Sequence, residues 1–293
     1  MNARLALLIR SLITLLVVVV AVVVTRWMWI HYELAPWSRD GRVRADVVTI
    51  APDVAGFVVS VAVVDNQAVR KGEPLFQLDR ARYEIALRQG LAAVARERAV
   101  LAEARREARR NDVLGDVVAF ELREQSQARV EEAAANLKQG IADVAAARLN
   151  LERTLVVAPV NGIVTNLELR PGDYMTVGRE ALALVDTDSL YVDGYFEETK
   201  LPRIHVGDRV SVRLMGESRI LYGRVQSVAA AIADRERTPS QNLVADINPN
   251  FNWVRLAQRV PVRIMLDTVP DDVRLIAGRT ATVVDLSFEP GSR

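Results

Sequence analysis

The chain of 293 residues contains no cysteine and only two histidines. The absence of cysteine excludes disulfides, thiolate nucleophiles, thiolate-ligated zinc and a lipid-modified N-terminal cysteine. His31 and His205 lie far apart and have no ligand-spaced partners, so neither predicts a metal site or acid–base catalysis. A glycine-rich phosphate loop with its lysine and Ser/Thr is also missing, which argues against an ATPase or a kinase. We therefore expect a protein that is not an enzyme and holds no metal or cofactor.

The chain also lacks a surplus of charge of one sign. It has 38 Lys and Arg against 37 Asp and Glu, a net charge of +1. Nucleic-acid binding would favour a basic surplus on one surface, so we expect no nucleic-acid partner. Half of the residues are hydrophobic, which is enough apolar material for the cores of two or three small domains.

The longest apolar run lies at the N-terminus. No residue from Ser11 to Val24 is charged, and a helix over Leu7–Ile30 would measure about 36 Å, enough to span a bilayer. Arg4 and Arg10 precede the apolar core, which predicts a cytoplasmic N-terminus and places the following chain across the membrane. Aromatic residues suited to the outer interface follow it: Trp27, Trp29, Tyr32 and Trp37. A cleaved signal peptide is the alternative, but small residues would then follow the apolar run. We assign residues 1–37 to an uncleaved anchor and its interface.

Two stretches, roughly 107 residues apart, repeat one pattern. Ala51–Val58 runs on to Leu75–Asp79, and Ala158–Val164 runs on to Leu182–Asp186. Each reads Ala-Pro, Gly, a β-branched run, a Gly-containing turn and then Leu-x-x-apolar-Asp. Two matching halves on either side of a long insertion predict one small β-domain, formed by residues 38–79 and 155–186.

The insertion, residues 80–154, has a helical pattern. Apolar residues recur every seven positions, first at Leu87, Val94, Leu101 and Ala108, then at Val130, Leu137, Val144 and Leu151. Alternate positions fall at Leu91, Ala134 and Ile141, while arginines intrude on this seam at Arg98, Arg105 and Arg148. The pattern predicts an antiparallel hairpin of two helices of about 45 Å each. A long parallel homodimer is disfavoured because Asn111 and Gly115 interrupt the run.

The remainder, residues 187–288, reads as short strands between turns. We expect them at Tyr191–Phe196, Arg209–Leu214, Tyr222–Val228, Arg259–Leu266 and Thr280–Val284. This spacing predicts a small antiparallel barrel. Asp234–Asn250 should be a loop, Arg39–Asp46 a connector, and residues 289–293 a frayed tail.

In this order of parts the chain resembles the HlyD-type periplasmic adaptors, also called membrane-fusion proteins. Local strings carry the resemblance too: Leu151–Thr154, Glu197–Leu201 and Trp253–Arg263. The resemblance implies an α+β multidomain fold with a transmembrane helix, a split biotinyl/lipoyl-like β-domain, a coiled-coil hairpin and a β-barrel. It implies an oligomeric adaptor in the inner membrane of a Gram-negative cell, with most of the chain periplasmic. Such an adaptor links an inner-membrane transporter to an outer-membrane channel, and the last string favours export of small aromatic carboxylic acids.

The resemblance also implies contacts between the hairpin tip and the channel. Relatives often have an Arg, a Leu and a Ser around the tip, and Arg110 and Leu114 match the first two. Glu121 stands where the serine is expected, while Ser126 lies too far along, and Val118 falls in the same loop. The alternative is that all of these are ordinary residues flanking a loop.

Three other functions are weaker. A lipoyl carrier would present a lysine at an exposed hairpin tip, but Asp79–Arg80 and Leu155–Val157 have none, and Lys71 reads as a surface charge. The chain could instead serve another exporter, of other drugs or of proteins, although protein-secretion relatives generally carry longer helices. It could also be a membrane-anchored scaffold that exports nothing.

Overall fold

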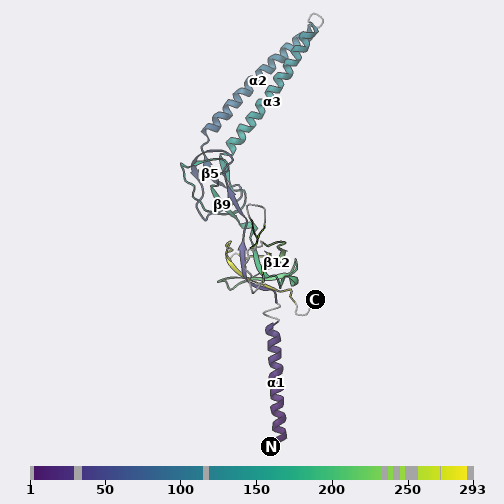
Figure 1. Ribbon diagram of the computed structural model, residues 1–293. Helices are drawn as coiled ribbons and strands as arrows, with labels where there is room; N and C mark the ends of the chain where they lie inside the picture. Colours follow the sequence, from purple (N-terminus) through teal and green to yellow (C-terminus); the bar gives the residue numbers. More distant parts are fainter. Residues whose placement is uncertain are drawn as a thin grey trace. The chain divides into compact units, whose positions relative to one another are not determined.

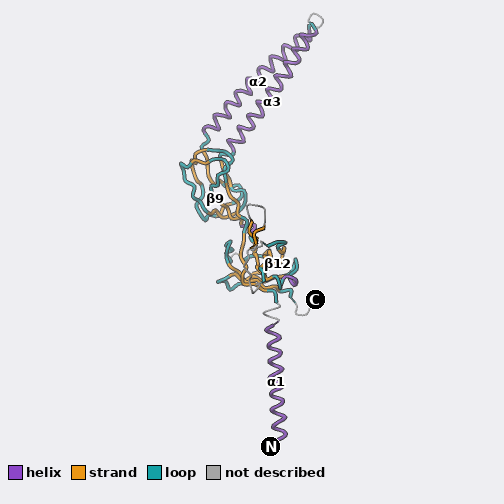
Figure 2. The backbone as a smooth tube through the Cα atoms, viewed as in Figure 1, coloured by secondary structure: helices purple, strands orange, loops and turns teal. Residues whose placement is uncertain are grey.

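The computed structural model describes residues 3–29, 35–114, 119–232, 237–239, 245–247, 257–270 and 272–288. For residues 3–11, 237–239 and 245–247 only the backbone is described. The chain divides into two compact units (Figures 1 and 2). One unit comprises Met1–Asp46 and Ser189–Arg293, and the other comprises Val47–Asp188.

The first unit begins with the long helix α1, Ala3–Trp29. Within it, Leu12–Trp29 has a mean hydropathy of 2.3, long and apolar enough to cross a membrane. Its described apolar side chains, from Leu12 to Trp29, are all solvent-exposed within the protein, so no protein core explains their hydrophobicity. The predicted apolar helix is therefore present, and Ile30 at its predicted end lies outside the described residues.

The same unit contains a closed antiparallel barrel with strand order β1-β10-β15-β12-β11-β16. These strands are β1 Trp37–Arg44, β10 Tyr191–Glu197, β11 Arg209–Leu214, β12 Ile220–Val228, β15 Arg259–Leu266 and β16 Thr280–Asp285. Alternate residues point inward, and Phe196, Val192 and Ile264 are among the fully buried ones. Short 3₁₀ turns lie at Thr187–Ser189 and Leu201–Arg203. The five strands predicted here are confirmed. The predicted loop Asp234–Asn250 differs, because it carries the paired strands β13 Arg237–Pro239 and β14 Ala245–Ile247.

Strand β1 stands where a connector is expected at Arg39–Asp46. It pairs with β10 on one side and β16 on the other, and thereby closes the barrel. Polar residues dominate its sequence, and only Ser38, Gly41 and Val43 are buried. A β-carbon at position 41 would lie 2.8 Å from the carbonyl oxygen of Ala281, so glycine allows the close pairing with β16. The barrel thus takes residues 37–44, and the split β-domain begins at Val47 rather than at residue 38.

The second unit contains a sandwich of two four-stranded antiparallel sheets, ordered β2-β9-β7-β4 and β6-β5-β3-β8. The first half of the repeat forms β2 Val47–Ile50, β3 Gly56–Val61, β4 Ala68–Val69 and β5 Pro74–Leu78. The second half forms β6 Leu155–Val157, β7 Gly162–Thr165, β8 Tyr174–Met175 and β9 Leu182–Asp186. The halves match strand for strand: β2 corresponds to β6, β3 to β7, β4 to β8 and β5 to β9. Each sheet therefore takes two strands from each half, so the halves interlock around one core.

Hydrogen bonds repeat with the same symmetry. The amide of Asn66 donates to the carbonyl of Val164 at 2.9 Å, and in the matching place the amide of Gly172 donates to the carbonyl of Val58 at 2.8 Å. Both donors have positive φ, 63° at Asn66 and 99° at Gly172, where glycine and asparagine are tolerated best. The repeat seen in the sequence is thus a repeat of backbone structure.

Two long helices fill the gap between β5 and β6: α2 Ala81–Val113 and α3 Phe120–Glu152. They lie side by side and antiparallel, as Figure 1 shows, which confirms the predicted hairpin. Because β5 and β6 are neighbours in one sheet, the hairpin continues a pair of antiparallel strands without a crossover.

Candidate functional site

The base of the hairpin is held by a network of hydrogen bonds between buried Thr154 and half-buried Gln77. The Thr154 side chain is fully buried, and its hydroxyl donates to the carbonyl of Leu151 at 2.6 Å. The side-chain amide of Gln77 donates to the carbonyl of Thr154 at 2.9 Å, to its hydroxyl at 3.1 Å and to the carbonyl of Leu78. Because Gln77 lies on β5 and Thr154 follows α3, these bonds join the last strand before the hairpin to its returning helix.

Two further contacts tie the helices to the first repeat segment. The Tyr83 hydroxyl, in the first turn of α2, donates to the carbonyl of Ala55 at 2.7 Å. The Arg153 guanidinium, at the end of α3, lies 3.0 Å from the Asp53 carboxylate. Both carbonyl and carboxylate belong to the Ala-Pro…Gly segment, so this segment braces each foot of the hairpin separately. The string Leu151–Thr154, which carried part of the family resemblance, is the foot of α3.

The seam between the helices is confirmed in part. Val94, Leu101 and Ala108 are buried at the predicted seven-residue spacing. The alternate positions, however, lie one residue earlier than expected. Gly90 and Gly140 face the partner helix, while Leu91 and Ile141 are about half exposed. The arginines expected to intrude, Arg98, Arg105 and Arg148, are accordingly all exposed outside the seam.

Glycine contacts give the register of the seam. A β-carbon built at Gly90 would lie 3.1 Å from a methyl of Val144, and one built at Gly140 would lie 3.3 Å from a methyl of Val94. The two residue numbers add to 234 in both pairs. Extended along the hairpin, this register sets most large seam residues of one helix against a small residue of the other; Leu137, level with Glu97, is an exception. Leu101, for example, is level with Ala133, and both are buried.

The pairing of large with small residues affects how closely the two helices pack. Small residues at every second layer let the helix backbones approach closely, which maximises the contacts between them. A surface ion pair between Arg129 and Glu107, 3.3 Å apart, flanks the seam in its distal part. With 33 residues in each helix, the result is a rod about 50 Å long that is rooted in the sandwich.

The predicted tip residues lie on both sides of the loop that joins the helices. Arg110 is exposed in the last turn of α2, and Leu114, half exposed, caps that helix by donating its amide to the carbonyl of Arg110. Glu121 is exposed in the first turn of α3. Val118 lies outside the described residues. Ser126 does not replace the missing tip serine, because it is buried in the seam and its hydroxyl donates to the carbonyl of Arg123.

Sequence reasoning missed two apolar residues at the tip. Val113 is 87 % exposed and Phe120 is 74 % exposed, the largest exposures among the large apolar side chains that the structure describes in the hairpin. Both residues fall outside the seven-residue pattern of the seam. Their position could have indicated an exposed apolar surface from the sequence alone, because an apolar side chain off the seam does not pack against the other helix. Beside them a shallow hollow of about 480 Å³ is lined by Ala119, Glu121, Leu122, Glu124, Gln125 and Ala128. The end of the hairpin thus combines exposed apolar side chains with charge.

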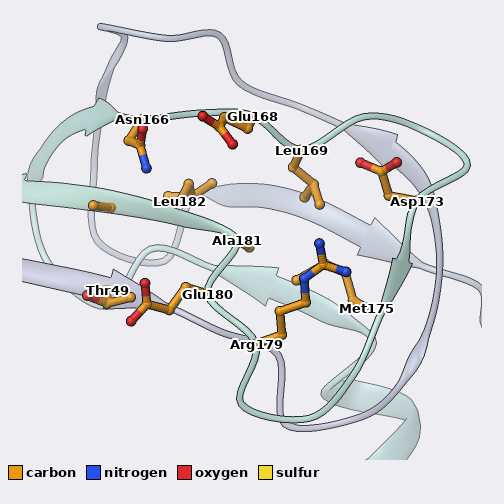
Figure 3. A pocket seen from close by; sticks show the side chains of 11 residues that line it. Thr49, Asn166, Glu168, Leu169, Asp173, Met175, Arg179, Glu180, Ala181 and Leu182 are labelled. Carbon is orange, nitrogen blue, oxygen red and sulfur yellow. The ribbon is translucent and has the colours of Figure 1, made fainter.

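A second hollow, of about 380 Å³, lies in the sandwich (Figure 3). Acidic and apolar side chains line it: Leu169, Met175 and Leu182 are buried, while Glu168 and Glu180 are exposed. The guanidinium of Arg179 reaches across it and donates to the carbonyl of Tyr174 at 3.2 Å. Figure 3 shows no nucleophile and base facing each other here. Among the described residues, no group of three His, Asp or Glu side chains is placed to hold a metal ion.

Two carboxyl groups of the barrel have perturbed acidity. Burial raises the pKa of Asp193, and the nearby guanidinium groups of Arg263 and Arg44 partly oppose that effect. Burial likewise raises the pKa of Asp285, whose Oδ1 accepts from the Ser287 amide while Oδ2 has no partner among the described residues. Neither Asp193 nor Asp285 lines either of the two hollows described above.

Comparisons with known proteins cover both units. Residues 46–187 match the family described as the RND MFP barrel-sandwich hybrid domain, and residues 189–285 match the AAEA-like beta-barrel domain. The uncharacterized protein YdhJ of Escherichia coli (strain K12) is 40 % identical over 271 residues, which is 92 % of this chain and 95 % of that protein.

Solved structures share the fold at low sequence identity. The membrane fusion protein Spr0693 from Streptococcus pneumoniae R6 superposes with a TM-score of 0.63 at 16 % identity, covering 85 % of this chain and 98 % of that one. MacA from Actinobacillus actinomycetemcomitans gives 0.57 at 18 % identity, covering 87 % and 82 %.

Proposed function

Because the chain belongs to the membrane-fusion proteins, the adaptors of RND-type efflux systems, we propose that it is the adaptor subunit of a tripartite pump. In this role it links an inner-membrane transporter to an outer-membrane channel. The observation that supports this best is the braced hairpin: a rod about 50 Å long on a β-sandwich can bridge two partners and needs no chemistry. The family consists of adaptors rather than enzymes, in agreement with the prediction that the chain is not an enzyme.

The N-terminal anchor supports the cellular location that we propose for the protein. Helix α1 crosses the inner membrane once, and Arg4 and Arg10 hold the N-terminus in the cytoplasm. The barrel and the sandwich then lie in the periplasm. A C-terminal fusion to a reporter that is active only in the periplasm should be active. Activity from a reporter that works only in the cytoplasm would overturn the orientation.

The hairpin tip is the surface that we propose for the channel. Arg110, Leu114, Val118 and Glu121 flank or lie in its loop, and the exposed apolar residues Val113 and Phe120 adjoin them. Exposed apolar side chains surrounded by charge are typical of protein interfaces. Docking of the hairpin end onto the helices of a channel would bury them.

The cargo that we propose is a small aromatic carboxylic acid or a related compound. The barrel matches the AAEA-like description, and the local strings resemble AaeA, the adaptor subunit of a p-hydroxybenzoic acid efflux pump. Copies of the adaptor would surround the export path as a homo-oligomer. The alternative is an adaptor for another exporter, of other drugs or of proteins.

The test compares a gene deletion with two complementing chains. Deletion should sensitise cells to exported compounds, including aromatic carboxylic acids, and the full-length chain should restore resistance. The second chain replaces residues 80–153 with a two-residue turn between β5 and β6, which are already antiparallel neighbours. It should fold and copurify with the transporter but fail to restore resistance. Unchanged sensitivity of the deletion across a broad panel, or full rescue by the chain without the hairpin, would contradict the proposal.

A further inference from the structure

The outer face of the sandwich carries a pair of exposed aromatic rings close to the foot of α2. Phe57 on β3 and Tyr174 on β8 are cross-strand partners, and their rings form an edge-to-face pair with centroids 5.0 Å apart. Phe57 is 57 % exposed and Tyr174 is 44 % exposed. Val59, which is also exposed, follows on the same strand and extends the apolar surface. The pair therefore leaves aromatic surface open to a ligand.

A guanidinium group is held beside these rings. Arg82, exposed in the first turn of α2, lies with its guanidinium 4.8 Å from the centroid of the Tyr83 ring and donates to the Tyr83 hydroxyl at 2.8 Å. That hydroxyl in turn donates to the carbonyl of Ala55, which fixes its position. The phenol groups raise the pKa of the Arg82 guanidinium, Tyr83 most and Tyr174 less, so the positive charge lies near both hydroxyls.

The charge of Arg82 is not neutralised by an acidic side chain. Among the residues that the structure describes, no carboxylate forms an ion pair with it, whereas Arg153 at the foot of α3 pairs with Asp53 at 3.0 Å. A guanidinium has five N–H donors, so after it bonds to both phenol oxygens it can still bind a carboxylate through two parallel hydrogen bonds. Arg82 is thus a fixed cation with spare donors, next to exposed aromatic rings.

The ligand that suits this arrangement has a flat aromatic ring and a negative charge. Its ring stacks on the exposed pair, and its carboxylate accepts a forked bond from Arg82. The dimensions agree, because the carboxyl carbon of benzoate is about as far from its ring centre as the hydroxyl oxygen of tyrosine is from its own. A benzoate ring stacked on Tyr174 therefore brings its carboxylate to the guanidinium beside the Tyr174 hydroxyl. An uncharged phenol or an aliphatic acid makes only one of the two contacts.

We propose that the foot of α2 binds small aromatic carboxylates, with Phe57 and Tyr174 as the surface for the ring and Arg82 as the partner of the carboxylate. The site is an open ledge, so its affinity is weak, with a Kd of about 1 mM for a ligand of about ten non-hydrogen atoms. Weak binding suits a compound that has to be released again. This inference rests on the proposed function and assigns its cargo a place on the adaptor. The other hollow of the sandwich, with exposed Glu168 and Glu180, disfavours an anion.

The test is a fluorine NMR titration of para-fluorobenzoate with the full-length chain in detergent micelles. The wild-type chain should shift and broaden the fluorine resonance, and an excess of benzoate should reverse the change. Arg82→Gln should weaken binding by at least about tenfold, because a hydrogen bond to a charged group is lost. The matched control is Arg88→Gln, at an exposed arginine about two turns further along α2 that lies over no described aromatic ring, and it should bind like the wild type. Equal thermal unfolding of the two variants shows that both are folded.

Changes to the rings and to the ligand supply the second arm. Phe57→Leu/Tyr174→Leu keeps an apolar surface but removes both rings, so it should weaken binding by about tenfold. Cyclohexanecarboxylate, which has the charge without the aromatic ring, and para-fluorophenol, which is uncharged at pH 7, should both compete much more weakly than benzoate. Equal binding by Arg82→Gln and the wild type, or equal competition by cyclohexanecarboxylate, would overturn the inference. A wild-type chain that leaves the resonance unchanged would also overturn it and would mean that the cluster only braces the hairpin.

Resistance of cells is scored separately from binding. If the chain binds para-fluorobenzoate through Arg82 but its deletion sensitises cells to no compound, only the pump role is contradicted. If deletion sensitises cells to aromatic acids but the chain does not bind para-fluorobenzoate, only this inference is contradicted.

Discussion

Replacing Gly162 with alanine should destabilise the sandwich, whereas the same change at Gly56 should not. The two glycines open β7 and β3, which are equivalent strands of the interlocked halves, and neither has a positive φ. A β-carbon at position 162 would lie 2.6 Å from the carbonyl oxygen of Val185 in the neighbouring strand β9. At position 56 the nearest atom is the β-carbon of Leu78 at 3.6 Å, an ordinary contact.

The magnitudes follow from these distances. Alanine reduces the entropy of the unfolded chain relative to glycine, which stabilises a protein by about 0.4–1 kcal/mol where the native backbone accepts it. This gain should appear in full for Gly56→Ala. At Gly162 the obstacle is backbone within a paired strand, so overpacking should cost about 3 kcal/mol, near the upper end of the usual range. The net effect of Gly162→Ala is then a loss of about 2 kcal/mol.

A buried thiol reports the opening of this one unit in the full-length chain. Val63→Cys places the only cysteine of the protein in the sandwich core, where the valine side chain is buried. Its labelling rate at increasing urea measures the free energy of opening. A loss of 2 kcal/mol should speed labelling about 30-fold in Gly162→Ala, while Gly56→Ala should slow it. Equal rates in the two variants, or a change of the same sign, would refute the argument from the Val185 carbonyl.

Three further changes test other parts. Asp285→Asn should stabilise the barrel at pH 7 by about 1 kcal/mol in thermal unfolding, because burial raises the pKa of this carboxyl and the ionised form is disfavoured in the folded state. The gain should disappear as the pH falls below the unfolded pKa of about 3.9, and a gain that persists in acid would contradict this cause. Thr154→Val keeps the shape of a fully buried side chain but removes the hydroxyl that donates to the Leu151 carbonyl and accepts from the Gln77 side chain, so hydrogen exchange should speed up in the last turn of α3 and remain unchanged at its start. Leu114→Asp should reduce recovery of the channel in pull-downs with little loss of stability, whereas Ile141→Asp, at a residue of equal exposure away from the tip, should not; equal recovery with both would reject the docking role.

The hairpin shows what a hydrophobic pattern can and cannot predict. The seven-residue spacing of Val94, Leu101 and Ala108 located one row of the seam correctly. The second row was placed at Leu91 and Ile141 because large apolar residues are expected inside. Gly90 and Gly140, one residue earlier, lie in that row instead, and each faces a valine of the other helix. Which residues lie in the second row depends on the surface of the other helix, and the sequence of one helix alone does not reveal that surface.

Strand β1 illustrates the same limit in the barrel. Its residues are mostly polar and include Gly41, so no local propensity favours a strand there. The strand exists because β10 and β16 offer pairing edges on both sides, and those strands lie about 150 and 240 residues away in sequence. The other barrel strands alternate buried with more exposed residues along most of their length and were predicted with nearly correct bounds. At the tip, pattern reasoning selected Arg110 and Leu114 by resemblance, while the more exposed Val113 and Phe120 emerged only from their solvent exposure.

The interlocked sandwich also dictates an order of folding. Neither sheet can be completed until β6 to β9 exist, and 76 residues separate the end of β5 from the start of β6. At the usual rate of synthesis these residues take roughly 4–15 s to appear, during which the first four strands have unpaired edges. The two helices of the hairpin, by contrast, are joined by a short loop and can pair from the tip toward the sandwich before the second half of the sandwich is complete. Once formed, the hairpin holds β5 and β6 side by side in register, and the remaining strands of the sandwich can then pair with them.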